Sequence, residues 1–176
     1  MLLLGHGASG TSASMRPWVD ALAPRGVESL ALDLPRGRAE RAVGVFEAAL
    51  DADPGAAVGG HSFGGRVASL FAAERAVAAL VLLSYPLHRP GRQQELRTEH
   101  WSRIGCPVLL LSGERDPFAR LDLLRREVER LADAELVTYP RTGHGLITHV
   151  DDASERIARF LERVSSPRRS RAARRG

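Results

Sequence analysis

Short apolar runs alternate along the chain with segments in which apolar residues recur every three or four positions. The short runs are typical of buried strands, and the periodic segments are typical of amphipathic helices. Six strands are predicted, at residues 1–4, 27–32, 56–58, 78–84, 107–112 and 135–139. Helices are predicted at about residues 15–23, 39–50, 66–74, 120–132 and 152–164. This alternation favours an α/β fold, a three-layer sandwich in which helices cover both faces of a mostly parallel sheet of about six strands.

Composition favours one globular domain at residues 1–164, with 44% hydrophobic and 26% charged residues in a chain of 176. The net charge of +4 arises from residues 165–176, which we expect to form a disordered, solvated arm with nucleic-acid binding as the less favoured role. That segment holds no acid and five arginines, Arg168, Arg169, Arg171, Arg174 and Arg175.

Features of the remaining sequence indicate a cytoplasmic location. The single cysteine, Cys106, excludes an internal disulfide and is expected to pack at the head of a strand. The opening residues have no basic region typical of a signal peptide. The longest apolar stretch, residues 77–85, is too short to span a membrane.

A serine flanked by glycines stands at the third strand-to-helix junction. Ser62 has Gly60 two residues before it and Gly64 two residues after it. A serine that rises clear of a sheet edge needs a strained backbone, and its close neighbours must lack colliding side chains. The spacing therefore predicts a nucleophile at Ser62, although a glycine-rich turn that carries a serine by chance would look the same.

A serine becomes a strong nucleophile only when a base takes its proton and a third group orients that base. Asp116 follows the fifth predicted strand and His144 follows the sixth, so both should lie at the same sheet edge as Ser62. Asp116 is the expected acid, with Glu114 as its nearest rival and a simple turn before Pro117 as the structural alternative. His144 is the expected base, with His149 as the fallback.

Two backbone amides are needed to stabilise an oxyanion beside this serine. One is expected from Phe63, the residue after the nucleophile, and the other from the loop after the first strand, where Ala8 is the best candidate and Gly7 the next. His61 is expected to pack or hydrogen-bond rather than react. No metal ion and no cofactor are expected.

Taken together, four motifs resemble the α/β-hydrolase superfamily and, more narrowly, a dienelactone-hydrolase-like group that includes a testis-expressed protein and a chromatin-complex (NSL) subunit. The resemblance covers about residues 1–164 and implies Ser62 as nucleophile, Asp116 as acid, His144 as base, and Ala8 with Phe63 as oxyanion donors. The motifs are Gly5-His6-Gly7-Ala8, Gly60-His61-Ser62-Phe63-Gly64-Gly65, Ser112-Gly113-Glu114-Arg115-Asp116 and Gly143-His144.

Two departures from that resemblance change the expectation. Dienelactone hydrolases carry a cysteine nucleophile, so Ser62 favours general esterase or thioesterase chemistry. The fold usually has two further strands before the loop that begins at Gly5, so we expect either that the sequence starts late or that it is a minimal variant whose edge strand is residues 27–32. An exposed edge favours pairing, and a homodimer is one expectation.

The irregular segment at residues 85–103 occupies the place where lids enter this fold, and a short helix is expected at about residues 96–104. Such a short segment predicts an open, shallow cleft for small or flexible acyl substrates. Trp101 and Leu87 are candidates for its lining. Arg89 or Arg92 would attract an anionic substrate, although solvated arginines are the simpler interpretation.

The leading hypothesis is therefore a serine hydrolase that cleaves a small-molecule carboxylic ester or thioester through an acyl-enzyme. The alternative is a non-catalytic binding or scaffold domain that retains the hydrolase fold. A flavodoxin-like nucleotide binder would fit the strand order, but the sequence lacks a dinucleotide fingerprint.

Overall fold

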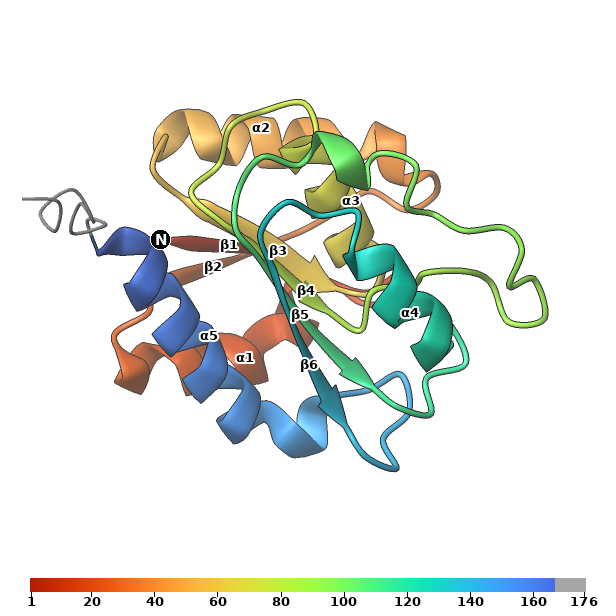
Figure 1. Cartoon of the computed structure of the whole chain (residues 1–176). Coiled ribbons are helices and arrows are strands. Elements are labelled where there is room, and N and C mark those ends of the chain that lie inside the picture. The colour runs from red at the N-terminus through yellow and green to blue at the C-terminus, as the bar shows by residue number, and fades with distance from the viewer. Residues whose placement is uncertain (167–176) are drawn as a thin grey trace, which may run out of the picture.

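The computed structural model describes residues 1–166 and contains one sheet with the strand order β2-β1-β3-β4-β5-β6 (Figure 1). Every pairing between these strands is parallel, as the sequence predicts. The expected arm at residues 165–176 lies almost entirely outside the described residues, and helix α5 continues to Ser165. The strands are β1 (Leu2–Gly5), β2 (Ser29–Leu32), β3 (Ala57–His61), β4 (Leu80–Leu83), β5 (Val108–Gly113) and β6 (Ala134–Tyr139).

Helices cover both faces of the sheet, as a parallel sheet with apolar central strands requires (Figure 1). The buried side chains divide into two clusters, one between the sheet and α2, α3 and α4, and the other between the sheet and α1 and α5. This is the predicted three-layer arrangement. The helices are α1 (Arg16–Leu22), α2 (Val43–Ala52), α3 (Phe63–Ala72), α4 (Leu121–Val128) and α5 (Val150–Ser165).

Strand β2 forms one edge of the sheet, which confirms the predicted edge strand. The four central strands are buried, whereas Leu30 of β2 is 46% exposed. The predicted helix at residues 39–50 is divided into a 3₁₀ turn at Ala39–Arg41 and α2. Helix α3 begins three residues earlier than predicted, because the turn at Ser62 leads directly into its first residue.

The two ends of the segment at residues 85–103 pack into the core, whereas its middle, residues 89–97, stays mostly exposed. Trp101 and Leu87 are fully buried, so the expectation that they line a cleft is wrong. The Trp101 ring meets the Tyr85 ring edge-on at 5.0 Å, and the expected helix is only the 3₁₀ turn Trp101–Arg103. Hydrophobic burial of these rings holds the segment against α3 and α4.

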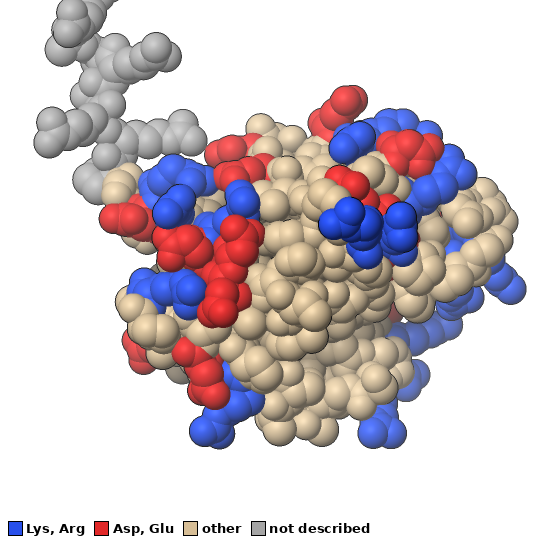
Figure 2. Space-filling view, turned by 90° about the horizontal axis from the view of Figure 1, so that it is seen from below, with Lys and Arg blue, Asp and Glu red and all other residues tan. Residues whose placement is uncertain are grey.

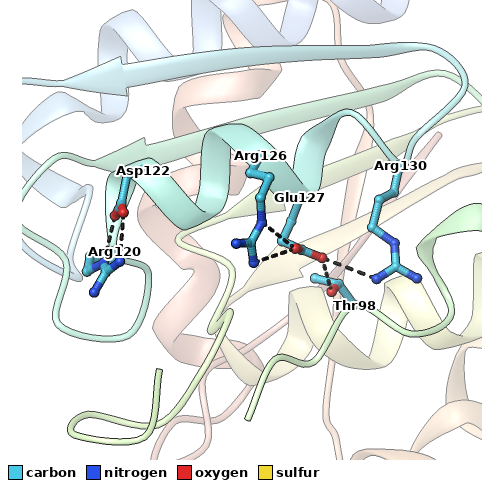
Figure 3. Close-up of polar contacts among 6 residues, drawn as sticks. All are labelled: Thr98, Arg120, Asp122, Arg126, Glu127 and Arg130. Atoms are coloured by element: carbon cyan, nitrogen blue, oxygen red, sulfur yellow. Dashed lines mark hydrogen bonds and ion pairs between the residues drawn. The ribbon is translucent and has the colours of Figure 1, made fainter. Parts of the chain in front are cut away.

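Glu127 of α4 anchors the same segment through a buried carboxylate (Figure 3). The Thr98 hydroxyl donates to Glu127 Oε2 at 2.6 Å, and the guanidinium groups of Arg126 and Arg130 donate at 3.0 and 3.3 Å. Burial alone raises the pKa of Glu127, but these hydrogen bonds outweigh it and lower the pKa. The charged carboxylate therefore links α4 to Thr98 of the segment at residues 85–103.

Cys106 is half-buried and packs against the larger core cluster, and burial raises the pKa of its thiol to about 11. This agrees with the predicted packing role. On the face seen from below, acidic and basic side chains intermix along one side, and the middle is a broad uncharged stretch (Figure 2). None of the helices within residues 1–166 has the length and apolar character to cross a bilayer.

Candidate active site

Ser62 occupies a strained turn between β3 and α3. Its backbone has φ 51° and ψ −111°, a conformation that side-chain-bearing residues rarely adopt. Its N–H donates to Leu83 O of β4 at 2.8 Å, and its carbonyl accepts from Arg66 N at 3.0 Å, the first hydrogen bond of the helix. Sheet and helix hold the turn from both sides, so its strain is supported by the surrounding structure.

The flanking glycines are required because the turn lies against the backbone of β1. A Cβ atom on Gly60 would lie 2.4 Å from Gly5 O, and one on Gly64 would lie 2.2 Å from both C and O of Gly5. Gly64 N also donates to His6 O at 2.9 Å. Close approach of two backbones therefore explains the glycine spacing that singled out Ser62 in the sequence.

The structure brings Ser62, His144 and Asp116 together from three separate loops. His144 Nε2 lies 2.8 Å from Ser62 Oγ, and His144 Nδ1 lies 2.8 Å from Asp116 Oδ2. The Asp116 side chain is fully buried, and the His144 side chain is 23% exposed. Because a carboxylate only accepts hydrogen bonds, the His144 proton belongs on Nδ1, which leaves Nε2 to accept the serine proton.

The loop that carries Asp116 is fixed by its own backbone and by the histidine loop. Asp116 Oδ1 accepts from Phe118 N at 2.8 Å, which leaves Oδ2 for His144. Arg115 N donates to Thr142 O at 2.8 Å, joining the two loops. The Phe118 ring also lies 4.5 Å from the His144 ring, a contact that the sequence did not predict.

The alternative acid and base are engaged elsewhere. Glu114 Oε1 accepts from the Thr138 hydroxyl at 2.9 Å. His149 lies 2.8 Å from the Thr142 hydroxyl and stacks on Tyr139 with 4.5 Å between ring centroids. Neither forms a hydrogen bond with His144 or Ser62 within the described part of the chain.

His61 packs beside the candidate base, as its sequence context predicts. Its Nε2 lies 3.3 Å from His144 O, and the two rings are 5.3 Å apart. Burial lowers the pKa of His61 from its ordinary value, and the neighbouring His144 ring adds to this effect. A neutral His61 supports the His144 loop without adding a positive charge next to it.

The candidate oxyanion donors, Ala8 and Phe63, lie on the two segments that meet at the serine. A Cβ atom on Gly7 would lie 4.0 Å from Ser62 Cβ, so the loop after β1 passes directly beside the serine. Within residues 1–166, neither the Ala8 N–H nor the Phe63 N–H donates a hydrogen bond to another protein group. Both amides are therefore without a protein acceptor among the described residues.

Three histidines with no distinctive sequence context form hydrogen bonds between distant segments of the fold. His6 Nε2 accepts from Leu34 N at 3.0 Å, and His88 Nε2 accepts from Arg120 N at 3.1 Å. His100 Nε2 lies 2.8 Å from the Ser69 hydroxyl, and burial lowers the pKa of His100 to about 4. These partners lie far away in the sequence, which gave no local signal for them.

Two hollows border the serine turn. One, of about 340 Å³, is lined by His61 and mainly uncharged residues, including Gly7, Trp18, Leu146 and Ile147. The other, of about 390 Å³, is lined by Phe63 and several arginines. Within residues 1–166, no group of three or more His, Cys, Asp or Glu side chains is arranged to hold a metal ion.

A family model described as an alpha/beta hydrolase domain matches residues 37–165, which is more than half of the chain. This region contains Ser62, Asp116 and His144, whereas the loop with Ala8 precedes it.

Solved structures with the same fold include hydrolases from archaea and bacteria. The monoacylglycerol lipase of Paleococcus ferrophilus has a TM-score of 0.81 and 18% identity, covering 93% of this chain and 94% of its own. Est1E from Butyrivibrio proteoclasticus has a TM-score of 0.75 and 18% identity, with 92% and 88% covered. An esterase of Pyrococcus furiosus has a TM-score of 0.77 and 18% identity, with 92% and 81% covered. At these identities the likeness concerns the fold.

Proposed function

The chain belongs to the α/β-hydrolase family, and on this premise we propose that it is a serine hydrolase of carboxylic esters or thioesters. The observation that carries the proposal is the continuous hydrogen-bonded series from Ser62 through His144 to Asp116. Each contact is 2.8 Å long, and the series ends on a buried carboxylate. The lipase and the esterase among the structural neighbours support the same reaction class.

In the proposed mechanism, His144 Nε2 takes the Ser62 proton as Ser62 Oγ attacks the carbonyl carbon of the ester. The carbonyl oxygen becomes an oxyanion that accepts hydrogen bonds from Phe63 N–H and Ala8 N–H. His144 then donates the proton to the departing alcohol or thiol, and the acyl group stays on Ser62. His144 then takes a proton from water as the water oxygen attacks the acyl carbon, and it returns that proton to Ser62 Oγ as the acyl–oxygen bond breaks and the carboxylic acid leaves.

Asp116 keeps the His144 ring in the required tautomer and stabilises its charged form. The strained Ser62 backbone holds the hydroxyl at the sheet edge. The side chains of Ser62 and His144 are half-buried there and reach solvent. These features argue against a purely non-catalytic binding domain, since a scaffold has no need to maintain such strain. The narrower resemblance to the dienelactone-hydrolase-like group remains part of the proposal.

The direct test is hydrolysis of 4-nitrophenyl acetate by the wild type and by Ser62→Ala and His144→Ala. Both variants should lose at least about 10³-fold in kcat. Ser102→Ala is a matched control because Ser102 is exposed and its hydroxyl makes no hydrogen bond with residues 1–166. Undiminished turnover by His144→Ala, or loss confined to His149→Ala, would overturn the assignment of the base.

A further inference from the structure

Arginines dominate the wall of the second hollow, which borders the serine turn at Phe63. Phe63, the residue after the serine, lines it, and Arg66 lies one helical turn further along α3. The other charged residues come from the segment after β2 and the segment after β4. The full charged lining consists of Arg38, Glu40, Arg66, Arg89 and Arg97.

Only one of these four arginines has a carboxylate partner among the described residues. Arg66 forms an ion pair with Glu40 at 3.2 Å. Arg38, Arg89 and Arg97 form no ion pair within residues 1–166. Three guanidinium groups of the hollow therefore lack a direct ion pair with the described residues, and only the more distant charges of Glu40, near Arg38, and Glu95, near Arg97, offset them in part.

Arg97 is the most enclosed of the unpaired arginines. It is half-buried, and within residues 1–166 its guanidinium donates only a long hydrogen bond, 3.5 Å, to Pro86 O. Burial lowers the pKa of Arg97, and the nearby charges of Arg66 and Arg89 lower it further. Like charges are thus held together at a cost that a bound anion would offset.

We propose that the arginine hollow, defined by Arg38, Arg66, Arg89 and Arg97, binds a carboxylate on the ester substrate, which makes the protein selective for acidic esters. Guanidinium groups recognise carboxylates through charge-assisted, often bidentate hydrogen bonds. The inference rests on the proposed function, because it places this carboxylate beside the serine that is acylated. The uncharged hollow next to His61 accommodates the neutral part of the same substrate.

Two pairs of esters separate a charge on the acyl side from a charge on the alcohol side. The acyl pair is 4-nitrophenyl hydrogen adipate and its methyl ester, and the alcohol pair is 4-acetoxybenzoate and its methyl ester. In one of the pairs, the acid should have a kcat/KM about tenfold or more above that of the neutral ester. The preference should shrink in 0.5 M NaCl, because the hollow is open to solvent and its charges are screened.

Arg38→Gln and Arg97→Gln should each reduce this preference by about five- to tenfold. Arg125→Gln is the control, since Arg125 is an exposed residue of α4 that makes no ion pair with described residues and does not line the hollow. If kcat/KM for the acid were equal to or lower than that for the neutral ester in both pairs, the proposal would be overturned. A preference that persists unchanged in both Arg38→Gln and Arg97→Gln would do the same.

The neutral methyl esters and a binding measurement separate this inference from the proposed function. Turnover of the neutral esters without preference for the acids would support the hydrolase function and refute the carboxylate-binding role of the arginine hollow. Adipate binding to Ser62→Ala, measured by calorimetry and weakened at least fivefold by a second change, Arg97→Gln, would support the hollow even if no ester were turned over. Adipate binding that is equal in Ser62→Ala and in the double variant Ser62→Ala, Arg97→Gln would count against the inference.

Discussion

His144 Nδ1 lies 2.8 Å from Asp116 Oδ2, and this contact joins two loops at the carboxyl ends of β5 and β6. Phe118 N donates to the other oxygen, Asp116 Oδ1, so Oδ2 is the oxygen that faces the histidine. Burial of the Asp116 side chain removes competing water from this contact. The orientation of the candidate base is therefore determined by residues 28 positions apart in the sequence.

Asp116→Asn should lower kcat for 4-nitrophenyl acetate by about 10³- to 10⁴-fold with little change in KM. An asparagine side chain still accepts from Phe118 N, so the loop is retained, but its amide can direct the wrong histidine tautomer. Steady-state kinetics, with circular dichroism as a check on folding, would measure the effect. Glu114→Gln is the control, and a larger loss there than in Asp116→Asn would reverse the assignment of the acid.

Gly64→Ala should destabilise the protein by about 3 kcal/mol or more, because its Cβ would lie 2.2 Å from backbone atoms of Gly5. Gly44→Ala in α2 is the matched control, since a Cβ there meets no atom within 4 Å. That change should leave stability equal or raise it by about 0.5–1 kcal/mol. Urea denaturation of both variants would check this, and equal stabilities would contradict the account of the turn.

Thr98→Val should destabilise the protein by about 1–3 kcal/mol, since Glu127 is buried and loses a hydrogen bond of 2.6 Å. The valine preserves shape, so the loss reports the hydroxyl rather than packing. Thr11→Val, at an exposed residue whose hydroxyl makes no cap hydrogen bond, should change stability by less than about 0.5 kcal/mol. Equal effects in the two variants would show that Glu127 does not anchor the 85–103 segment.

Stability should fall as the pH decreases from 6.5 toward 4, partly because of His100. Burial lowers the pKa of His100 to about 4 from an ordinary value of 6.5, so the unfolded chain binds the proton first. The stabilisation from neutral His100 is present above pH 6.5 and lost through this window. By linkage, the wild type should lose about 3 kcal/mol more than His100→Gln between pH 7 and pH 4. Parallel pH profiles of the two proteins would contradict the prediction.

The sequence predicts the sheet, and it indicates which side chains the structure brings together at the sheet edge, because both depend on local patterns. Continuous apolar runs such as residues 80–83 identify strands buried on both faces. The Gly60-Ser62-Gly64 spacing reflects a backbone contact with Gly5, and the turns after β5 and β6 must reach the same sheet edge.

Features formed between distant segments could not be predicted in this way. Trp101 belongs to an irregular segment with no periodicity, so nothing in the sequence indicated that its ring turns into the core. Glu127 is an acid on an amphipathic helix, and its burial depends on partners from the 85–103 segment. The arginine hollow likewise combines residues from three segments whose proximity is a property of the fold.

The measurement that tests the central claim most directly is labelling of the purified protein by a fluorophosphonate, with the adduct located by mass spectrometry. A serine activated by His144 should react in a one-to-one ratio at Ser62, and Ser62→Ala should not be labelled. His144→Ala should be labelled at least about 100-fold more slowly, because its serine keeps its proton. A folded wild-type protein that shows no adduct at Ser62, or an adduct rate equal to that of His144→Ala, would contradict the account.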